Sequence, residues 1–341
     1  MKASASGVVP VAAAPVLLQV NNLAVHFPAK AVGAPWNKPG LVRAVDDVSF
    51  KLQANETMGL VGESGCGKST LARAVIRLLP PTDGQVLFEG RDIATLSEQQ
   101  LGDMRSNIQM VFQDPASSLN PRMTVAQVLA EPMQIARWEE ARIQDRINGL
   151  LTLVGLDNTH MQRYPHEFSG GQKQRIGIAR ALALSPKLVV CDEPVSALDV
   201  SVQAQIINLL KDIQDRLGVS YLFVAHDLGV VRQISHRLMV MYLGKIVEQA
   251  PKVAFFSRPM HPYSQALLSA IPRPRPGALS NRIILSGDLP SPLNPPSGCR
   301  FRTRCPLATQ ECARTEPALR ELGPDHRVAC HFAEKAQLVS G

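Results

Sequence analysis

Short apolar runs alternate with segments of helical periodicity over the first 250 residues. Between the apolar runs, hydrophobic positions recur every three or four residues, most clearly over 201–217, where Ile206, Leu210 and Ile213 share one face. Alternating strands and helices are typical of an α/β domain. The runs predicted as strands cover 17–27, 44–52, 57–62, 85–89, 108–113, 187–192, 219–225 and 238–243.

Two segments depart from this alternation. Residues 124–160 carry no strand pattern and predict a mostly helical insertion, in which Trp138 serves packing. Residues 1–16 hold one basic residue and are interrupted by prolines, which predicts a disordered leader rather than a secretory signal. No run of 18 uninterrupted apolar residues occurs, so we expect a cytoplasmic protein without a membrane span.

Composition separates the end of the chain from the rest. The 341 residues, 45% hydrophobic and 19% charged, suit a soluble globular protein of about two domains and exclude disordered, collagen-like and coiled-coil classes. Residues 251–341 hold 13 of the 26 prolines, and 12 Lys and Arg against 6 Asp and Glu. This shift predicts a domain boundary near Pro251, with a small, Pro-rich and basic C-terminal domain after it.

The basic tail contains no nucleic-acid-binding motif, so we expect no nucleic-acid partner. Cysteine is concentrated there as well, since only Cys66 and Cys191 lie outside it. In a cytoplasmic protein such clustering favours a metal site over disulfides. The tail cysteines are Cys299, Cys305, Cys312 and Cys330.

The segment Gly62-Glu-Ser-Gly-Cys-Gly-Lys68-Ser69 matches the P-loop pattern between a predicted strand and a predicted helix. Its glycines let backbone N–H groups turn inward and, with the helix N-terminus, hold phosphate oxygens. We expect Lys68 to reach the β- and γ-phosphates of ATP and Ser69 to ligate Mg²⁺. The candidate ATP-binding residues of this segment are Gly62, Glu63, Ser64, Gly65, Cys66, Gly67, Lys68, Ser69 and Thr70.

A second apolar strand, 187–192, ends in two adjacent carboxylates. A P-loop protein holds Mg²⁺ with an aspartate at this place, which points to Asp192, and Glu193 is placed to polarise an attacking water. A solvated acidic turn is the alternative interpretation of this pair.

The segment Ser169-Gly-Gly-Gln-Lys-Gln-Arg175 resembles the signature of the ABC (ATP-binding cassette) ATPases. Three further positions match other motifs of that family: Gln113 its Q-loop, Asp199 its D-loop and His226 its switch histidine. The order and spacing of these motifs carry the resemblance, which extends from residue 17 to about residue 250.

This resemblance implies an α/β fold with a RecA-like core, an antiparallel β subdomain and a helical subdomain at about 114–184. It implies two such domains paired head to tail, with ATP between one P-loop and the partner's signature residues. Those residues are Ser169, Gly170, Gly171 and Gln172. The signature glycines would begin a helix over 172–184, whose N-terminus would face the γ-phosphate across the interface.

The resemblance also implies the roles of individual side chains. Glu193 would be the general base, His226 would contact the γ-phosphate, and Gln113 would sense nucleotide and ligate Mg²⁺ with Ser69 and Asp192. Asp199 would cross the interface between the two domains. Phe27 matches the adenine platform by position only, and an ordinary strand-end aromatic is the alternative.

Three shorter segments, 113–122, 164–169 and 260–263, resemble the ATPase subunits of bacterial dipeptide and oligopeptide importers. Such a subunit works at the cytoplasmic face of the inner membrane with two membrane permease subunits and, indirectly, an extracytoplasmic peptide-binding protein. The resemblance favours a heterodimer with a sister ATPase over a homodimer. Importers of nickel and other small solutes share this pattern. Soluble ABC proteins and a metal or redox sensor stay as alternatives.

The tail cysteines fit the same subfamily, in which some members ligate a [4Fe–4S] cluster with four cysteines. The spacing here is Cys299-x5-Cys305-x6-Cys312-x17-Cys330. We expect a [4Fe–4S] cluster; Zn²⁺ and four free thiols are the alternatives. Cys66 stands at a predicted helix N-terminus, which predicts a lowered thiol pKa and reaction with thiol reagents, whereas Cys191 is predicted to be inert.

Overall fold

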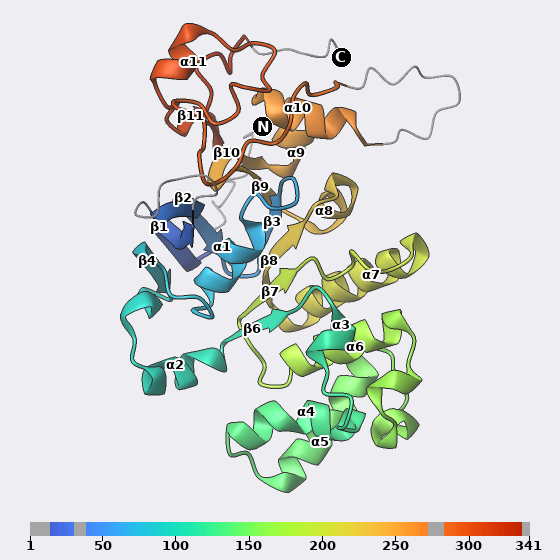
Figure 1. The fold of residues 1–341 in the computed structure, drawn as a ribbon. Helices are drawn as coiled ribbons and strands as arrows, with labels where there is room; N and C mark the ends of the chain where they lie inside the picture. Colours follow the sequence, from blue (N-terminus) through green and yellow to red (C-terminus); the bar gives the residue numbers. More distant parts are fainter. Residues whose placement is uncertain (1–13, 31–38, 272–282, 336–341) are drawn as a thin grey trace, which may run out of the picture.

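The structure, a computed structural model, describes residues 14–30, 39–271 and 283–335. The leader expected for 1–16 therefore lies outside the described residues, except for its last three positions. Figure 1 shows an upper body containing two sheets and a lower body made of helices, with the C-terminal region at the top. Among the described helices, none combines the length and apolarity needed to cross a membrane.

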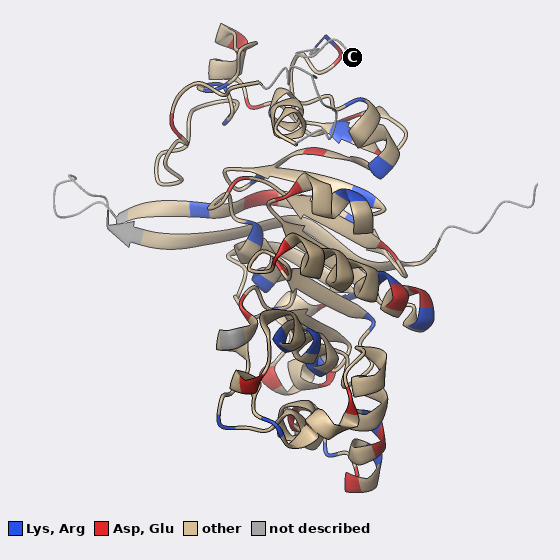
Figure 2. Cartoon of the chain, turned by 90° about the vertical axis from the view of Figure 1, so that its right-hand side faces the viewer, with Lys and Arg blue, Asp and Glu red and all other residues tan. Residues whose placement is uncertain are grey.

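The first sheet is antiparallel and has the strand order β2-β1-β4-β5. Its long strands β1 and β2 pair along almost their whole length and extend away from the body as a ribbon (Figure 2). The bounds are β1 Val16–Lys30, β2 Pro39–Gln53, β4 Asp83–Phe88 and β5 Arg91–Asp92.

The second sheet has the strand order β11-β12-β10-β9-β3-β8-β7-β6. Its centre, from β9 to β6, is parallel, and β10, β12 and β11 extend it by antiparallel pairing. The bounds are β3 Thr57–Val61, β6 Ile108–Val111, β7 Leu188–Asp192, β8 Ser220–Ala225, β9 Arg237–Tyr242, β10 Lys245–Pro251, β11 Arg320–Gly323 and β12 His326–Val328.

The parallel strands are continuous apolar runs because both of their faces are covered. In β7, Val189 and Cys191 belong to one core, whereas Leu188 and Val190 belong to the other. The first core contains side chains of α6 (Gly170–Ala181) and α7 (Val200–Leu217), and the second contains side chains of α1 (Lys68–Val75) and of the antiparallel sheet. Helices α1 and α6 therefore lie on opposite faces of the central sheet (Figure 1).

The described helices agree with the sequence periodicity. The 124–160 segment forms α4, α5 and a 3₁₀ turn at Asn158–Gln162, which confirms a helical insertion without strands. The α-helical bounds are α1 Lys68–Val75, α2 Glu98–Arg105, α3 Pro115–Ser118, α4 Val125–Ile135, α5 Glu140–Leu153, α6 Gly170–Ala181, α7 Val200–Leu217, α8 Leu228–Ile234, α9 Lys252–Ser257, α10 Pro262–Ser269 and α11 Gln310–Arg314.

The C-terminal region contributes strands to the central sheet. Strand β12 pairs with β10, and the buried carboxylate of Glu248 in β10 accepts hydrogen bonds from the N–H groups of Met260 and His261. His326 of β12 lies 2.7 Å from the same carboxylate. The composition boundary near Pro251 is thus not a break in the sheet.

Candidate functional site

The P-loop joins the fully buried strand β3 to helix α1. Gly67 caps α1 with φ 109°, a conformation that side chains disfavour, and a Cβ there would overlap the Ala44 carbonyl oxygen. A Cβ at Gly62 would overlap the Met241 carbonyl oxygen in the same way. The loop is therefore pressed against its neighbours, and the N-terminus of α1 presents backbone N–H groups to an anion.

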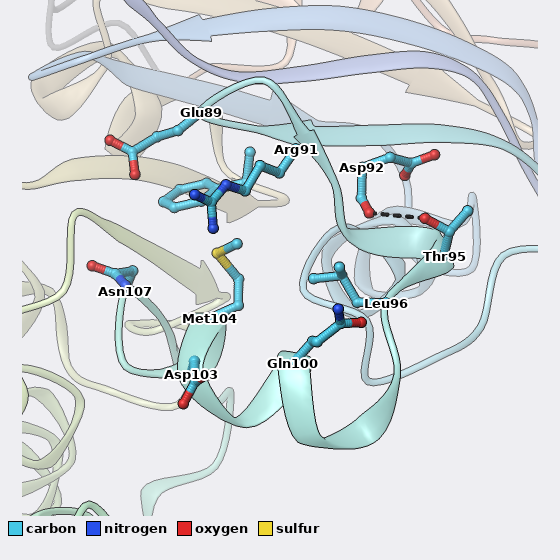
Figure 3. A pocket seen from close by; sticks show the side chains of 10 residues that line it. Glu89, Arg91, Asp92, Thr95, Leu96, Gln100, Asp103, Met104 and Asn107 are labelled. Carbon is cyan, nitrogen blue, oxygen red and sulfur yellow. Dashed lines mark hydrogen bonds between the residues drawn. The ribbon is translucent and has the colours of Figure 1, made fainter.

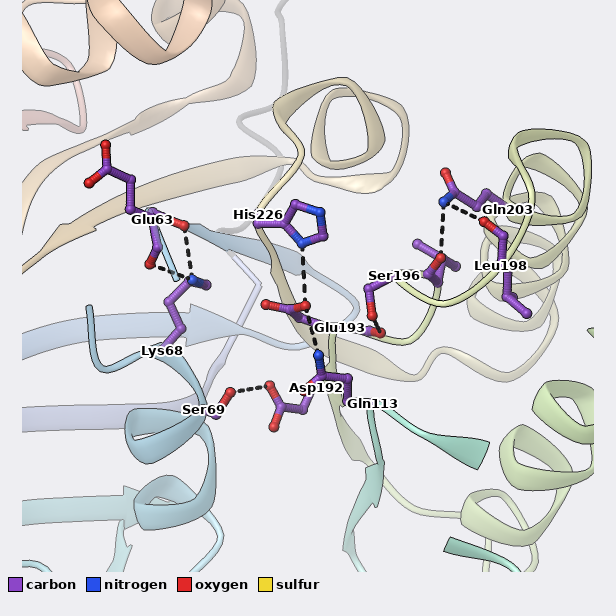
Figure 4. Close-up of polar contacts among 12 residues, drawn as sticks. Glu63, Lys68, Ser69, Gln113, Asp192, Glu193, Ser196, Leu198, Gln203 and His226 are labelled. Carbon is purple, nitrogen blue, oxygen red and sulfur yellow. Dashed lines mark hydrogen bonds and ion pairs between the residues drawn. The ribbon is translucent and has the colours of Figure 1, made fainter. Parts of the chain in front are cut away.

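Lys68 is held over this loop. Its side chain is almost fully buried, with an exposed fraction of 4%, and Nζ donates to the carbonyl oxygens of Gly62 at 2.9 Å and Glu63 at 3.0 Å (Figure 4). The positive charge is thus fixed beside the inward-turned backbone, where it can bind phosphate oxygens.

Ser69 and Asp192 form the next part of the site. The Ser69 hydroxyl donates to Asp192 Oδ1 at 2.8 Å, and Asp192 is 1% exposed at the carboxyl end of β7 (Figure 4). Burial raises the pKa of the Asp192 carboxyl, although the bond from Ser69 opposes this shift. A hydroxyl and a buried carboxylate are oxygen ligands of the kind Mg²⁺ prefers, so this pair fits a magnesium ion.

Glu193 lies between two other candidate residues. Gln113 Nε2 donates to Glu193 Oε2 at 3.1 Å, and His226 Nδ1 lies 3.3 Å from the same oxygen (Figure 4). Glu193 has φ 47°, in the left-handed region, and its N–H donates to the carbonyl of Val224 in β8. Because the parallel strands β6, β7 and β8 end at one edge, residues far apart in sequence meet there.

The signature residues begin helix α6. Ser169 Oγ accepts from Gln172 N–H at 3.3 Å and Gln172 Oε1 accepts from Ser169 N–H at 3.0 Å, which forms a capping box. A Cβ at Gly171 would stand 2.6 Å from Val202 of α7, so the glycine is also needed for helix packing. Helix α6 lies on the opposite face of the sheet from α1, and the structure does not bring this signature to its own P-loop.

The remaining two candidates are at the surface. Asp199 is the N-cap residue of α7, without a capping hydrogen bond from its side chain. The loop before it is held by Gln203, whose Nε2 donates to the carbonyls of Val195 at 3.0 Å and Leu198 at 2.9 Å (Figure 4). Sequence reasoning missed Gln203, although its position one turn after the capping residue is a usable signal. Phe27 of β1 is 38% exposed and paired with Val42 of β2.

The prediction for Cys66 was wrong. The side chain is 1% exposed and packs into the second core, and burial raises the pKa of the thiol, with the charge of Lys68 opposing. Position at a helix N-terminus suggested the opposite shift, but the sulfur points into the protein. Cys191 is fully buried, as predicted, and burial raises the pKa of its thiol well above the ordinary range.

We therefore expect Cys66 in the folded protein to react with iodoacetamide at neutral pH at least about 100-fold more slowly than in the unfolded chain. The measurement is mass spectrometry of the peptide containing Cys66 over time, with Cys191 as an internal control for burial. Native-state alkylation of Cys66 at the rate of a free thiol would contradict the buried, protonated state.

The four tail cysteines share one neighbourhood without forming a metal site. Burial raises the pKa of Cys299 to about 12 and that of Cys305 to about 11, and the other tail thiols add to the shift of Cys299. All four are free thiols. Within residues 14–30, 39–271 and 283–335, no three His, Cys, Asp or Glu side chains are arranged to hold a metal ion. These residues thus do not fit the expected [4Fe–4S] cluster or Zn²⁺.

A pocket of about 660 Å³ lies between the β4–β5 turn and α2 (Figure 3). Its lining, which runs from Phe88 to Asn107, includes none of the candidate residues. A smaller pocket of about 30 Å³ is lined by Glu193, Ser196 and His226. The candidate residues Glu193 and His226 thus line the pocket at the edge of the sheet and not the pocket beside α2.

Comparisons with known proteins agree with this geometry. The family model described as ABC transporter matches residues 45–196, and that described as Oligopeptide/dipeptide transporter, C-terminal region, matches residues 247–312. Oligopeptide transport ATP-binding protein AppF of Bacillus subtilis is 52% identical over 320 residues, covering 93% of this chain and 97% of that protein. OppF of Salmonella typhimurium is 52% identical over 321 residues, covering 92% and 96%.

Solved structures share the fold. The post-hydrolysis dimer of the ATP-binding cassette MJ0796, bound to ADP and Pi, has a TM-score of 0.61 at 26% identity, covering 69% of this chain and 98% of that one. CbiO1 of Clostridium perfringens has a TM-score of 0.62 at 26% identity, covering 71% and 91%. The chain has the ABC ATPase fold and belongs to the ABC transporter ATP-binding proteins that carry the oligopeptide/dipeptide transporter C-terminal region.

Proposed function

We propose that this chain hydrolyses MgATP at the edge of the central sheet and uses the reaction to drive import of oligopeptides or dipeptides. The observation that carries the proposal is the placement of Glu193, held by Gln113 and His226, next to the Ser69–Asp192 pair. The relatives named for oligopeptide transport, which match almost the whole chain, support the substrate class.

In this proposal the P-loop amides and Lys68 bind the phosphates. Ser69, Asp192 and Gln113 would hold Mg²⁺, which offsets the negative charge of the phosphates when it is bound. Glu193 takes the proton of the attacking water through its carboxylate. His226 hydrogen-bonds to that carboxylate and orients it. Phe27, exposed on β1, is the proposed platform for adenine.

The site needs a second ATPase chain. Helices α6 and α1 lie on opposite faces of the central sheet, so the signature of one chain does not reach the P-loop of that chain. In this proposal Ser169 and the signature glycines therefore bind ATP held by the P-loop of a partner chain. Asp199, at the start of α7, then lies at the shared boundary. The dimeric state of the cassette MJ0796 supports this pairing, and we propose a heterodimer with a sister subunit.

The transport partners follow from the same relatives. We propose that two membrane permease subunits bind this chain at the cytoplasmic face of the inner membrane, and that an extracytoplasmic protein delivers the peptide. We also propose the division into a nucleotide-binding domain, 17–250, with its helical subdomain at about 114–184, and a Pro-rich C-terminal domain, 251–341. The [4Fe–4S] cluster that the resemblance implies is not part of this proposal, because the cysteines of the described residues are not arranged to hold it.

Uptake by whole cells tests the proposal. Cells lacking this chain are complemented with wild type or Glu193→Gln and given labelled dipeptides, longer peptides or nickel. We expect peptide uptake to return with wild type alone. Rescue of nickel uptake instead would assign a small-solute importer. Unchanged uptake of every solute, in cells also lacking other peptide ATPases, would overturn the transport role.

A further inference from the structure

The P-loop carries a carboxylate at its second position. Glu63 follows Gly62, and its Oε2 accepts a hydrogen bond from Arg304 Nη1 at 2.7 Å, across 241 positions of sequence. The side chain of Arg304 is 11% exposed and that of Glu63 is 28% exposed. Although burial alone would lower the pKa of Arg304, its hydrogen bond to Glu63 raises it. A charge from the C-terminal region thus reaches the phosphate-binding loop.

A second contact fixes the backbone at the same residue. The N–H of Glu63 donates to the hydroxyl oxygen of Tyr263, in α10, at 2.9 Å. Burial raises the pKa of Tyr263 well above its usual value, so this hydroxyl stays neutral. Both the side chain and the N–H of Glu63 are therefore bound by residues after position 251.

The two contacts rest on a rigid support. The ring of Phe301, 1% exposed, packs with its centroid 5.2 Å from that of Tyr242 and 5.4 Å from that of Tyr263. Arg304 lies one tight turn later, since its N–H donates to the Phe301 carbonyl at 3.0 Å. Arg300 adds bonds to Asp46 and to the carbonyl of Leu243. This packing holds Arg304 at the loop.

The electrostatic consequence follows from the charge of the ligand. A loop that binds the phosphates of ATP gains from positive charge, and a carboxylate within it repels them. Arg304 offsets that repulsion, and its low exposure limits screening by solvent. Without Arg304, the Glu63 carboxylate would be an uncompensated negative charge in the phosphate-binding loop.

We propose that Arg304 and Tyr263 of the C-terminal region are positioning residues for ATP: Arg304 neutralises Glu63, and Tyr263 fixes the Glu63 backbone. The inference rests on the proposed phosphate-binding role of the P-loop. Neither residue touches the nucleotide in this proposal, and both act through Glu63.

The test is MgATP affinity of the full-length chain, measured by titration calorimetry at low and high salt. We expect Arg304→Ala to raise Kd about fivefold at low salt, with a smaller effect at high salt because salt screens the carboxylate that the variant leaves unpaired. The double variant Glu63→Gln/Arg304→Ala should return to within about twofold of wild type, because the repelling charge is gone. Tyr263→Phe keeps the ring and should raise Kd about threefold at either salt, since it removes only a hydrogen-bond acceptor.

Arg302→Ala is the matched control, since Arg302 bonds to Ser297 and not to the P-loop. Its Kd should equal that of wild type. Wild-type affinity in both Arg304→Ala and Tyr263→Phe would overturn the inference, as would an Arg304→Ala loss that Glu63→Gln does not relieve. Lys68→Ala tests the proposed phosphate-binding role of the P-loop separately from the role of Arg304 and Tyr263. Normal MgATP binding by Lys68→Ala would overturn the proposed phosphate site itself.

Discussion

Glu193→Gln is expected to lower the rate of ATP hydrolysis by about 100- to 1000-fold while MgATP still binds, because an amide cannot take a proton from water. The substitution preserves size and leaves an oxygen for the bond from Gln113. Steady-state phosphate release, measured beside MgATP affinity, separates chemistry from binding. If two ATPase chains pair around ATP as proposed, we also expect the variant to accumulate ATP-bound dimers, because hydrolysis would no longer remove the ligand between them.

The matched control is Glu98→Gln, at an exposed carboxylate in the first turn of α2. Its turnover should equal that of wild type. Wild-type turnover in Glu193→Gln would remove Glu193 from the chemistry. Loss of MgATP binding together with turnover would instead assign it to binding.

Lys68→Ala should weaken MgATP binding by about 100-fold, the second large effect, because it removes a buried positive charge beside the phosphates. The lysine also satisfies the carbonyls of Gly62 and Glu63, so the loop loses two hydrogen bonds as well. Titration calorimetry gives the affinity, and a thermal melt without nucleotide reports whether the fold persists.

Lys211→Ala, on the exposed side of α7, removes the same charge away from the site and should leave the affinity unchanged. Near-normal MgATP binding by Lys68→Ala, with the Lys211→Ala control also normal, would show that the phosphates do not lie at this loop.

Much of the central sheet could be read from local pattern. Strands β3, β7 and β8 are buried on both faces, so each is an unbroken apolar run that stands out from its flanks. The helix predicted over 201–217 matches α7, which begins one residue earlier, at Val200. It could be predicted because its apolar positions recur with the period of a helix. Strand β10 was missed: it contains Glu248 and Gln249, both buried, and a polar pair argues against a buried strand.

The chemistry of the site divides in the same way. Nucleotide chemistry could be predicted from local patterns, namely a P-loop and a pair of adjacent carboxylates. These patterns contain Lys68, Ser69, Asp192 and Glu193. Their contacts with Gln113 and His226 depend on three parallel strands ending at one edge. The resemblance to the ABC ATPases implied that these residues share one site. The distances between their side chains come from the fold.

Only tertiary packing decided the direction of the Cys66 thiol, the entry of β12 into the central sheet and the bond from Arg304 to Glu63. Periodicity, turns and motifs are properties of chain neighbours, and the printed sequence holds them completely. A side chain's burial, its pKa and a partner 241 positions away depend on which surfaces meet when the sheet and the C-terminal region pack, which no local pattern encodes.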